Sequence, residues 1–435
     1  MSNKTLQEKF KQTNAYKIAT DCQKKFFDSY FDGGNICLSG PAGTGKSFAL
    51  NSLSNFLDEN GVMVAMTATT GVAAFNIKGQ TIHSWAGIGL GDDDWMELVG
   101  KIKNNKILID KILGTHTLVI DEISMMKSDL LEKLHKIFKM LRFSVEPFGG
   151  MQIILCGDFL QLPPVWDNEE ERNFVFNSSI WKESNITTIY LKQIVRQHND
   201  PQFAELLNRL RVGDTSNLDL LKSRINFEFP KDGIDPVYLF CKNYDVEKLN
   251  KEMLNELAGV KKIFKSKDVG SPYHISFFDK HCQAISDLEL KIGAQVMLLA
   301  NIDTDNGLVN GSVGKIISYE VNGILVRFKT GKFIIEPYTW ELKEQKRVGL
   351  KMQKVVVASR TQYPLKVAYA LTVHKAQGST IDRAVIDISE AFAEGQIYVG
   401  LSRVRDLQSL SVSHFAHNRV KVNAECLKFY KNLGN

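Results

Sequence analysis

The amino-acid sequence predicts an α/β protein built on parallel sheets flanked by helices. Short apolar runs at 35–38, 117–120 and 152–156 have the length of buried strands, and glycine or acidic residues follow each run within two positions. Apolar residues at helical spacing come after the first run. A later segment, 314–342, alternates apolar and polar residues between turn signals, which is typical of an antiparallel β insert.

The composition sets the limits of this prediction. A chain of 435 residues with 44% hydrophobic and 24% charged residues is long enough for roughly two to four domains. No window approaches the ~18 apolar residues of a membrane span, and the first residues lack the apolar core of a secretion signal. We therefore expect no membrane partner and a cytoplasmic location. The net charge of +5 permits a polyanionic partner.

The six cysteines are scattered through the chain without a Cys-x-x-Cys pair. Several lie inside apolar runs, so we interpret them as small buried hydrophobes in a reducing compartment. Disulfide or metal use is the weaker alternative.

The stretch GPAGTGKS has the spacing of a phosphate-binding loop, Gly-x-x-x-x-Gly-Lys-[Ser/Thr]. Its glycines let backbone N–H groups face phosphate oxygens, Lys46 neutralises the β and γ phosphates, and Ser47 ligates Mg²⁺. The alternative is a glycine-rich turn that only opens a helix, here one with Phe48, Leu50, Leu53 and Phe56 on its apolar face. We expect the whole loop to bind ATP: Gly40, Pro41, Ala42, Gly43, Thr44, Gly45, Lys46 and Ser47.

A second strand supplies the carboxylates that such a loop needs. The run at 117–120 ends on Asp121 and Glu122. We expect Asp121 to hold Mg²⁺ through water and Glu122 to polarise the attacking water. The Asn-Lys-x-Asp motif that reads guanine is absent from the sequence, which favours an ATPase over a GTPase.

A third strand ends near a polar side chain. The run at 152–156 is followed by Gly157, Asp158 and then Gln161. Gln161 is placed to sense the γ-phosphate if this strand neighbours the strand of the loop. A solvated loop glutamine is the alternative.

Several stretches, in the same order along the chain, resemble one family. They are Gln23, GPAGTGKS, TATTGVAA (67–74), GQTIHSWAGIGLG (79–91), DEISMM, GDFLQLPPV, LKQIVRQ (191–197), LNRLRVG (207–213), LKIGAQVMLLAN (290–301), GLVNGSVGKI (307–316), YALTVHKAQGSTID (369–382) and IYVGLSRVR (397–405). With them the chain resembles the petite-integration-frequency (PIF) helicases, superfamily 1B motors that move 5′ to 3′ on single-stranded DNA.

This resemblance implies two RecA-like P-loop domains, a small wedge insert and an SH3-like β insert. The expected boundaries are 1–75 and 107–187 for the first RecA-like domain, 76–106 for the wedge, 188–313 and 366–435 for the second RecA-like domain, and 314–365 for the β insert. The strands expected in the second RecA-like domain are 235–241, 294–299, 367–374, 384–388 and 409–414.

The resemblance also assigns residues to the nucleotide. Hydrolysis at a phosphate loop is slow unless positive charge reaches the transferring phosphoryl group. In the family pattern Arg196 and Arg403 supply it, so the expected catalytic set is Lys46, Glu122, Gln161, Arg196 and Arg403. Gln23 and Gly378 are the further expected nucleotide contacts.

Contact with the DNA strand is implied for Thr69 and His83 in the first half and for Thr372, His374 and Lys375 in the second. Hydroxyl, imidazole and ammonium groups at loop tips suit phosphate oxygens. The implied partners are single-stranded DNA and junctions of single- and double-stranded DNA, with G-quadruplex DNA as a further candidate, and the chain is expected to be monomeric without DNA.

Two other functions stay open. The chain could be an RNA helicase or a protein-stripping translocase of the same superfamily, or a nucleotide-gated binding module with little turnover. The long N-terminal extensions of eukaryotic members are missing, from which we expect a bacterial, phage or viral origin.

Overall fold

The structure, a computed structural model, describes residues 2–89, 91–166, 172–303, 305–348, 351–414 and 417–434. The chain divides into two compact units. Unit 1 comprises Met1–Val195, Lys343–Val356 and Ala424–Asn435, and unit 2 comprises Arg196–Leu342 and Val357–Asn423.

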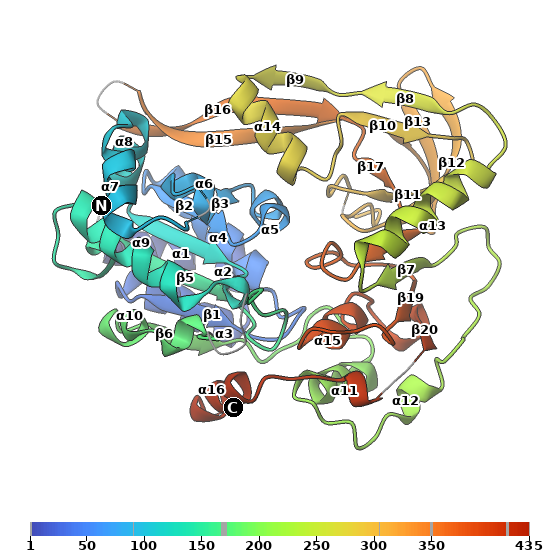
Figure 1. Cartoon of the computed structure of the whole chain (residues 1–435), viewed down its shortest axis with the longest axis horizontal. Helices are drawn as coiled ribbons and strands as arrows, with labels where there is room; N and C mark the ends of the chain where they lie inside the picture. The colour runs from blue at the N-terminus through green and yellow to red at the C-terminus, as the bar shows by residue number, and fades with distance from the viewer. Residues whose placement is uncertain are drawn as a thin grey trace. The chain divides into compact units, whose positions relative to one another are not determined.

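Unit 1 is built on a parallel sheet of six strands in the order β3-β2-β4-β5-β1-β6 (Figure 1). β1, β2, β4 and β5 are buried at every position, as expected of parallel strands covered on both faces. The predicted strands at 35–38, 117–120 and 152–156 are confirmed. The strand bounds are β1 Ile36–Ser39, β2 Val64–Ala68, β3 Gln80–Thr81, β4 Thr117–Asp121, β5 Gln152–Gly157 and β6 Thr187–Tyr190.

The helices of unit 1 bury aromatic and aliphatic side chains against the sheet, with Phe10, Phe26 and Phe27 in the core. The predicted helix after the phosphate loop is confirmed as α4, although Phe48 is 37% exposed and only the other three predicted apolar residues are buried. The helices are α1 Asn3–Lys11, α2 Asn14–Ile18, α3 Asp21–Phe31, α4 Lys46–Glu59, α5 Gly71–Asn76, α6 Ile82–Ala86, α7 Trp95–Lys103, α8 Lys106–Gly114, α9 Ser128–Leu141, α10 Ser179–Glu183 and α16 Ala424–Asn432.

Unit 2 contains a smaller parallel sheet in the order β18-β7-β19-β20. Its strands are β7 Val237–Phe240, β18 Ala370–Thr372, β19 Ala384–Asp387 and β20 Leu410–His414. Its helices are α11 Pro201–Arg211, α12 Asp219–Lys222, α13 Asn243–Glu256, α14 Pro272–His281 and α15 Gln396–Leu401.

An antiparallel sheet in the order β14-β13-β12-β11-β17 forms the β insert. Its strands are β11 Gln295–Leu298, β12 Val313–Glu320, β13 Gly323–Phe328, β14 Gly331–Ile335 and β17 Leu365–Val367. The prediction that 294–299 joins the second parallel sheet is wrong, because Val296 pairs antiparallel with Gly314 and Val367. The predicted strand at 367–374 is likewise divided between β17 and β18.

The remaining strands form two smaller sheets. β15 Tyr338–Val348 and β16 Lys351–Gln362 pair with each other, and β9 Lys267–Gly270 pairs with β16. β8 Lys262–Lys265 pairs with β10 Asp287–Leu290.

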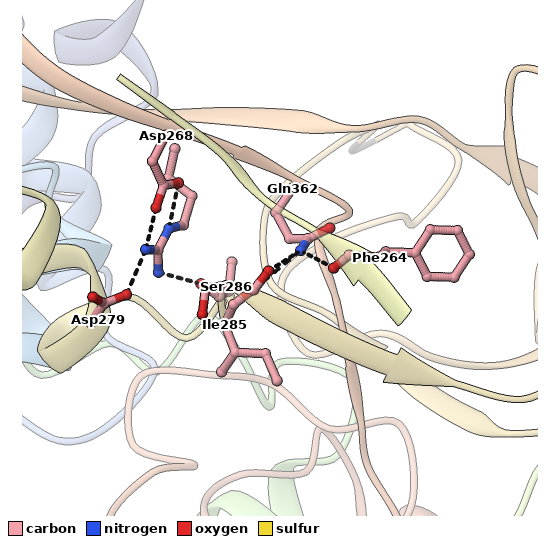
Figure 2. A network of polar contacts seen from close by, with 8 residues as sticks. Phe264, Asp268, Asp279, Ile285, Ser286 and Gln362 are labelled. Atoms are coloured by element: carbon pink, nitrogen blue, oxygen red, sulfur yellow. Dashed lines mark hydrogen bonds and ion pairs between the residues drawn. The ribbon is translucent and has the colours of Figure 1, made fainter. Parts of the chain in front are cut away.

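One polar network holds these strands together (Figure 2). Arg360 is fully buried and donates hydrogen bonds to Asp268 at 2.9 and 2.6 Å and to Asp279 at 2.6 Å, so it joins β16 to β9 and α14. Gln362 donates to the carbonyls of Phe264 at 2.8 Å and Ser286 at 3.2 Å. Arg360 and Gln362, both in β16, therefore bond to β9, α14, β8 and the residue before β10.

The division into units differs from the predicted boundaries at three places. Residues 188–195 group with unit 1, whereas the sequence predicts that they open the second RecA-like domain. The last helix, α16, groups with unit 1, whereas the sequence predicts residues 366–435 as part of the second domain. The middle of the long β15–β16 pair, Lys343–Val356, also groups with unit 1. The residues directly before α16 belong to unit 2. The domain that precedes a terminal helix in sequence therefore does not determine the domain against which the helix packs.

Candidate nucleotide and nucleic-acid site

The phosphate loop joins β1 to α4, and its glycines are required by geometry. Gly40, Gly43 and Gly45 have φ values of 153°, 80° and 82°. A Cβ on Gly40 would lie 2.6 Å from the carbonyl oxygen of Leu191, and one on Gly45 would lie 2.5 Å from the amide nitrogen of Gln23. Gly45 is also the N-cap of α4 and makes no side-chain cap, so the first N–H groups of the helix remain available to an anion.

The ammonium group of Lys46 binds two backbone carbonyl oxygens of its own loop. Its Nζ donates to the carbonyl oxygens of Gly40 at 2.7 Å and Pro41 at 2.9 Å. Thr44, which is buried, donates its hydroxyl to the same Pro41 carbonyl at 2.9 Å. The side chain of Ser47 is exposed at the start of α4. The loop therefore presents a cation and a free hydroxyl at a helix N-terminus, which is the donor set that a magnesium triphosphate requires.

The side chain of Gln23, in α3, contacts the backbone of this loop. Its Oε1 accepts from the backbone N–H of Thr20 at 2.9 Å as part of a capping box on α3. Its Nε2 donates to the carbonyl oxygens of Thr44 at 3.2 Å and Gly45 at 3.4 Å. The predicted nucleotide contact of Gln23 stays a prediction, and the observed contacts are with the loop backbone.

Asp121 and Glu122 lie where β4 ends. Asp121 is buried, and its Oδ1 accepts from the backbone N–H of Glu122 at 2.9 Å. Burial raises the pKa of Asp121, while the Glu122 N–H, the Cys156 thiol and the charge of Lys46 act in the opposite direction. The sequence pattern missed Cys156 as a contact of this carboxylate, although it lies at the end of the neighbouring strand, where Ile120 pairs with Leu155.

Gln161 follows β5 and is buried with Asp158. Its side-chain Nε2 donates to Asp158 Oδ2 at 3.4 Å, and its backbone N–H donates to the Asp158 carbonyl at 2.9 Å. The alternative of a solvated loop glutamine is therefore wrong.

The sheet brings these groups to one edge. Ser39, just before the loop, is in register with Gly157, and Ala68 is in register with Asp121. Because all these strands are parallel, their carboxyl ends meet at the same edge, where α/β sheets bind ligands. The loop, Asp121 and Gln161 therefore belong to one site in unit 1.

Thr69 connects this site to the turn after β2. Its hydroxyl donates to the carbonyl oxygen of Glu122 at 2.9 Å, and its N–H donates to the carbonyl oxygen of Asp121 at 3.1 Å. His83, in α6, is partly buried, and burial lowers its pKa although nearby Asp92 opposes this. Both residues belong to unit 1, as predicted for strand contacts of the first half.

In unit 2 the two predicted arginines meet at Ser402. Arg196 donates to the Ser402 carbonyl at 3.1 Å, and Arg403 donates to the Ser402 hydroxyl at 2.7 Å. Arg403 is 2% exposed and also donates to the carbonyl of Val399 at 2.7 Å. Two segments more than 200 residues apart in sequence thus place their guanidinium groups in one network.

The loop after β18 carries the other predicted residues of unit 2. Thr372 is buried, and its hydroxyl accepts from the N–H of Lys375 at 3.2 Å. The Lys375 side chain is exposed, and His374 is partly buried with its pKa lowered by burial. Gly378 is exposed, with a φ of 81°.

Two negative findings apply to the described ranges given above. Within them, no group of three or more His, Cys, Asp or Glu side chains is arranged to hold a metal ion by itself. No helix in that part of the chain has the length and hydropathy needed to cross a membrane. None of the six cysteines, all in described positions, is paired in a disulfide.

Comparison with known proteins places these features in a family. A family model described as a PIF1-like helicase matches residues 17–220, and one described as the 2B domain of DNA helicase Pif1 matches residues 277–319. The crystal structure of Pif1 helicase from Candida albicans is 36% identical with a TM-score of 0.74, and the match covers 96% of this chain and 99% of that chain. The chain belongs to the PIF1-like helicase family.

Other members of the family agree in sequence and structure. The ATP-dependent DNA helicase PIF1 of Danio rerio is 38% identical over 425 residues, which are 96% of this chain and 64% of that protein. Bacteroides sp. Pif1 in complex with ADP-AlF4 is 29% identical with a TM-score of 0.83, covering 96% of this chain and 97% of that chain. A Bacteroides Pif1 bound to ssDNA is 29% identical with a TM-score of 0.64, covering 96% and 98%. These matches confirm the predicted family and the predicted α/β fold of the RecA-like helicases.

The chain spans 62–64% of the length of the first curated relatives it matches. These relatives include the PIF1 helicases of Danio rerio and Homo sapiens, which are eukaryotic. They contradict the expectation of a bacterial, phage or viral protein in the cytoplasm. That expectation depended on a missing N-terminal extension, and the point at which a sequence begins does not identify its source.

Proposed function

We propose that the chain is an ATP-dependent DNA helicase that translocates 5′ to 3′ on single-stranded DNA and unwinds duplex or structured DNA. The observation that carries this proposal is the phosphate loop, whose Lys46 ammonium lies on two loop carbonyls at the sheet edge that also bears Asp121 and Glu122. The names of the relatives support it, since the curated proteins matched are ATP-dependent DNA helicases.

In unit 1 each residue of the site has a distinct role in this function. The two carbonyl contacts of Lys46 are the bonds that a β/γ-phosphate pair would replace, because phosphate oxygens are stronger acceptors for an ammonium group. Ser47 and Asp121 are the residues that would hold Mg²⁺, which supplies positive charge to the phosphates. Glu122 orients the attacking water, and Gln161 senses the γ-phosphate.

In unit 2 we assign Arg196 and Arg403 to the charge that develops on the transferring phosphoryl group. Both guanidinium groups donate hydrogen bonds to Ser402. A movement of the turn that contains Ser402 would displace both of them, which supports a shared role. Gln23 and Gly378 are the further nucleotide contacts in this proposal.

We assign the DNA strand to Thr69 and His83 in unit 1 and to Thr372, His374 and Lys375 in unit 2. The exposed ammonium of Lys375 suits a phosphate oxygen. Single-stranded DNA and single-strand/duplex junctions are the proposed partners, with G-quadruplex DNA as a further substrate and a monomer as the DNA-free state. A Bacteroides Pif1 structure bound to ssDNA, and a Pif1 structure described as the basis for DNA unwinding at forked dsDNA, support this choice of partner.

Two substitutions test the chemistry. Lys46→Ala should lower the rate of ATP hydrolysis by at least about a hundredfold, because the positive charge that neutralises the phosphates is lost.

Glu122→Gln should lower kcat to a similar extent yet keep nucleotide binding within about threefold, since only the water-orienting group changes. ATP hydrolysis and binding of a fluorescent ATP analogue are measured with and without single-stranded DNA. Equal hydrolysis with and without DNA would count against a DNA motor.

Polarity and strand type are tested on four substrates, DNA or RNA duplexes that carry either a 5′ or a 3′ single-stranded tail. The proposal predicts unwinding of the DNA duplex with the 5′ tail and little unwinding of the other three. Preference for a 3′ tail contradicts the direction, and preference for RNA favours the RNA helicase. ATP hydrolysis without unwinding of any substrate favours a stripping translocase.

A further inference from the structure

The last helix of the chain reaches the nucleotide site. Phe429 and Tyr430 hold α16, the helix drawn at the C-terminus in Figure 1, against unit 1. The ring of Phe429 lies 4.6 Å from that of Phe176 and 6.0 Å from that of Trp181, measured between centroids. Tyr430 is 5% exposed, and its ring lies 5.5 Å from that of Tyr190. Sequence patterns assign Tyr430 no role, because no motif surrounds it.

The hydroxyl group of Tyr430 makes three hydrogen bonds inside unit 1. It donates to Asp158 Oδ1 at 3.1 Å, accepts from the backbone N–H of Phe159 at 3.0 Å, and lies 2.7 Å from the hydroxyl oxygen of Ser39. A phenol has one proton to donate and two acceptor positions. Since that proton goes to the carboxylate, Ser39 must be the donor in the third bond.

The carboxylate that Tyr430 holds is itself a partner of Gln161. Asp158 has no exposed surface. Its oxygens accept from the Tyr430 hydroxyl, from the Leu160 N–H at 3.2 Å and from the Gln161 side chain at 3.4 Å. A buried carboxylate needs such donors, and its position depends on all of them. Loss of the phenol donor would shift Asp158 and, with it, the amide of Gln161.

The same hydroxyl also reaches the start of the phosphate loop. Ser39 is fully buried and directly precedes Gly40. Ser39 and Gly157 are in register on β1 and β5, so the phenol bridges the ends of the two strands that carry the loop and Gln161. One group from the other end of the sequence therefore sets the relative position of two parts of the site.

We propose that Tyr430 is a positioning residue for ATP hydrolysis, acting through Asp158 on Gln161 and through Ser39 on the phosphate loop. The inference depends on the proposed ATPase function of unit 1. It gives the C-terminal helix a part in catalysis, although Tyr430 itself touches no reacting atom in this assignment.

The substitution Tyr430→Phe removes only the hydroxyl and keeps the ring contacts. We expect kcat for DNA-stimulated ATP hydrolysis to fall about tenfold, with binding of a fluorescent ATP analogue unchanged within about twofold. We also expect faster hydrogen exchange at the amides of Phe159, Leu160 and Gln161. The kcat effect separates positioning from general stability, since a stability loss alone lowers the amount of active protein and not the turnover of the folded fraction.

Tyr30→Phe is the matched control. Tyr30 is 3% exposed, and its hydroxyl lies 2.8 Å from that of Thr117, the first residue of β4 at the opposite edge of the sheet. Each variant removes one buried hydroxyl group, which makes three hydrogen bonds in Tyr430 and one, with Thr117, in Tyr30. Tyr430→Phe should therefore lose at least as much thermal stability as Tyr30→Phe, and Tyr30→Phe should keep the wild-type kcat and the wild-type exchange of residues 159–161.

A double-mutant cycle with Asp158→Asn identifies the path. If Tyr430 acts partly through Asp158, the loss of kcat in the double variant should be clearly smaller than the product of the two single losses, and any loss beyond that of Asp158→Asn alone belongs to the Ser39 path. Wild-type kcat in Tyr430→Phe, an equal fall in Tyr30→Phe, or fully additive effects in the cycle would each overturn the inference. Those results leave the ATPase proposal intact. A wild-type chain without ATP hydrolysis would overturn both.

Discussion

Glu122 has a left-handed backbone, with φ 53° and ψ 43°, at the turn that follows β4. For a residue other than glycine this conformation costs about 1–3 kcal/mol. Hydrogen bonds on both sides maintain it: Asp121 Oδ1 accepts from its N–H, and its carbonyl accepts from Thr69. Glu122 directly precedes the short helix Ile123–Met125, and its left-handed backbone sets the direction of its side chain. A strained backbone at this carboxylate is consistent with the proposed role of orienting water.

The glycines of the loop give a sharper prediction at this scale. Gly40→Ala should destabilise the protein by about 1–3 kcal/mol and abolish nucleotide binding, because the new Cβ would lie 2.6 Å from a backbone oxygen that cannot move alone. Urea unfolding and binding of a fluorescent ATP analogue measure both effects.

Gly33→Ala is the control for that variant. Gly33 also has a positive φ, 85°, but a Cβ there would meet nothing within 4 Å. Its cost should be about 1 kcal/mol from the backbone alone, with nucleotide binding unchanged. Equal nucleotide binding by Gly40→Ala and Gly33→Ala would contradict the close approach at Gly40.

At the scale of elements, the sequence predicts β1, β4 and β5 of unit 1, but not β2, β3 or β6. Their apolar runs and the polar residues that follow them place the loop, Asp121 and Gln161 at one edge, because parallel strands share an edge for their carboxyl ends. Apolar content does not say which sheet a strand joins. For this reason the sequence predicts the wrong sheet for the run at 294–299. Its antiparallel pairing with β12 and β17 depends on how distant segments pack in the folded chain.

The Arg360 network provides a test of the insert. Hydrogen bonds from Arg360 hold the pKa of Asp268 below its ordinary value. The folded carboxylate thus stays charged at a lower pH than the unfolded one, so its stabilisation is present above about pH 4 and is lost as pH falls further. Asp268→Asn should lower the free energy of unfolding at pH 7 by about 3 kcal/mol, because Arg360 keeps a buried charge with one partner fewer.

Urea unfolding between pH 3 and pH 7 measures this effect. The variant should show a weaker dependence of stability on pH than the wild type. Asp219→Asn is the control, since its pair with Lys222 is exposed and should contribute much less. A wild-type pH profile for Asp268→Asn would show that the Arg360 network does not stabilise the insert.

At the scale of the whole molecule, the sequence motifs identified the family, but long-range packing was not readable from them. The grouping of α16 with unit 1 depends on the rings of Phe429 and Tyr430, which occur in no motif. Only the family resemblance predicts a shared role for Arg196 and Arg403, because nothing local to either residue indicates the other. The sequence does not predict their contacts with Ser402.

We propose that ATP hydrolysis needs the guanidinium groups of Arg196 and Arg403 in unit 2 in addition to the phosphate loop of unit 1. The most direct measurement is kcat for DNA-stimulated ATP hydrolysis in Arg403→Lys and Arg196→Lys, with nucleotide binding and thermal unfolding measured on the same samples. Arg209→Lys is the control, since Arg209 forms a partly exposed ion pair with Asp214 in the same unit. We predict that each site variant lowers kcat by at least about a hundredfold while folding and binding nucleotide, and that the control hydrolyses ATP like the wild type. Wild-type kcat in both folded site variants would contradict the claim and favour a nucleotide-gated binding module.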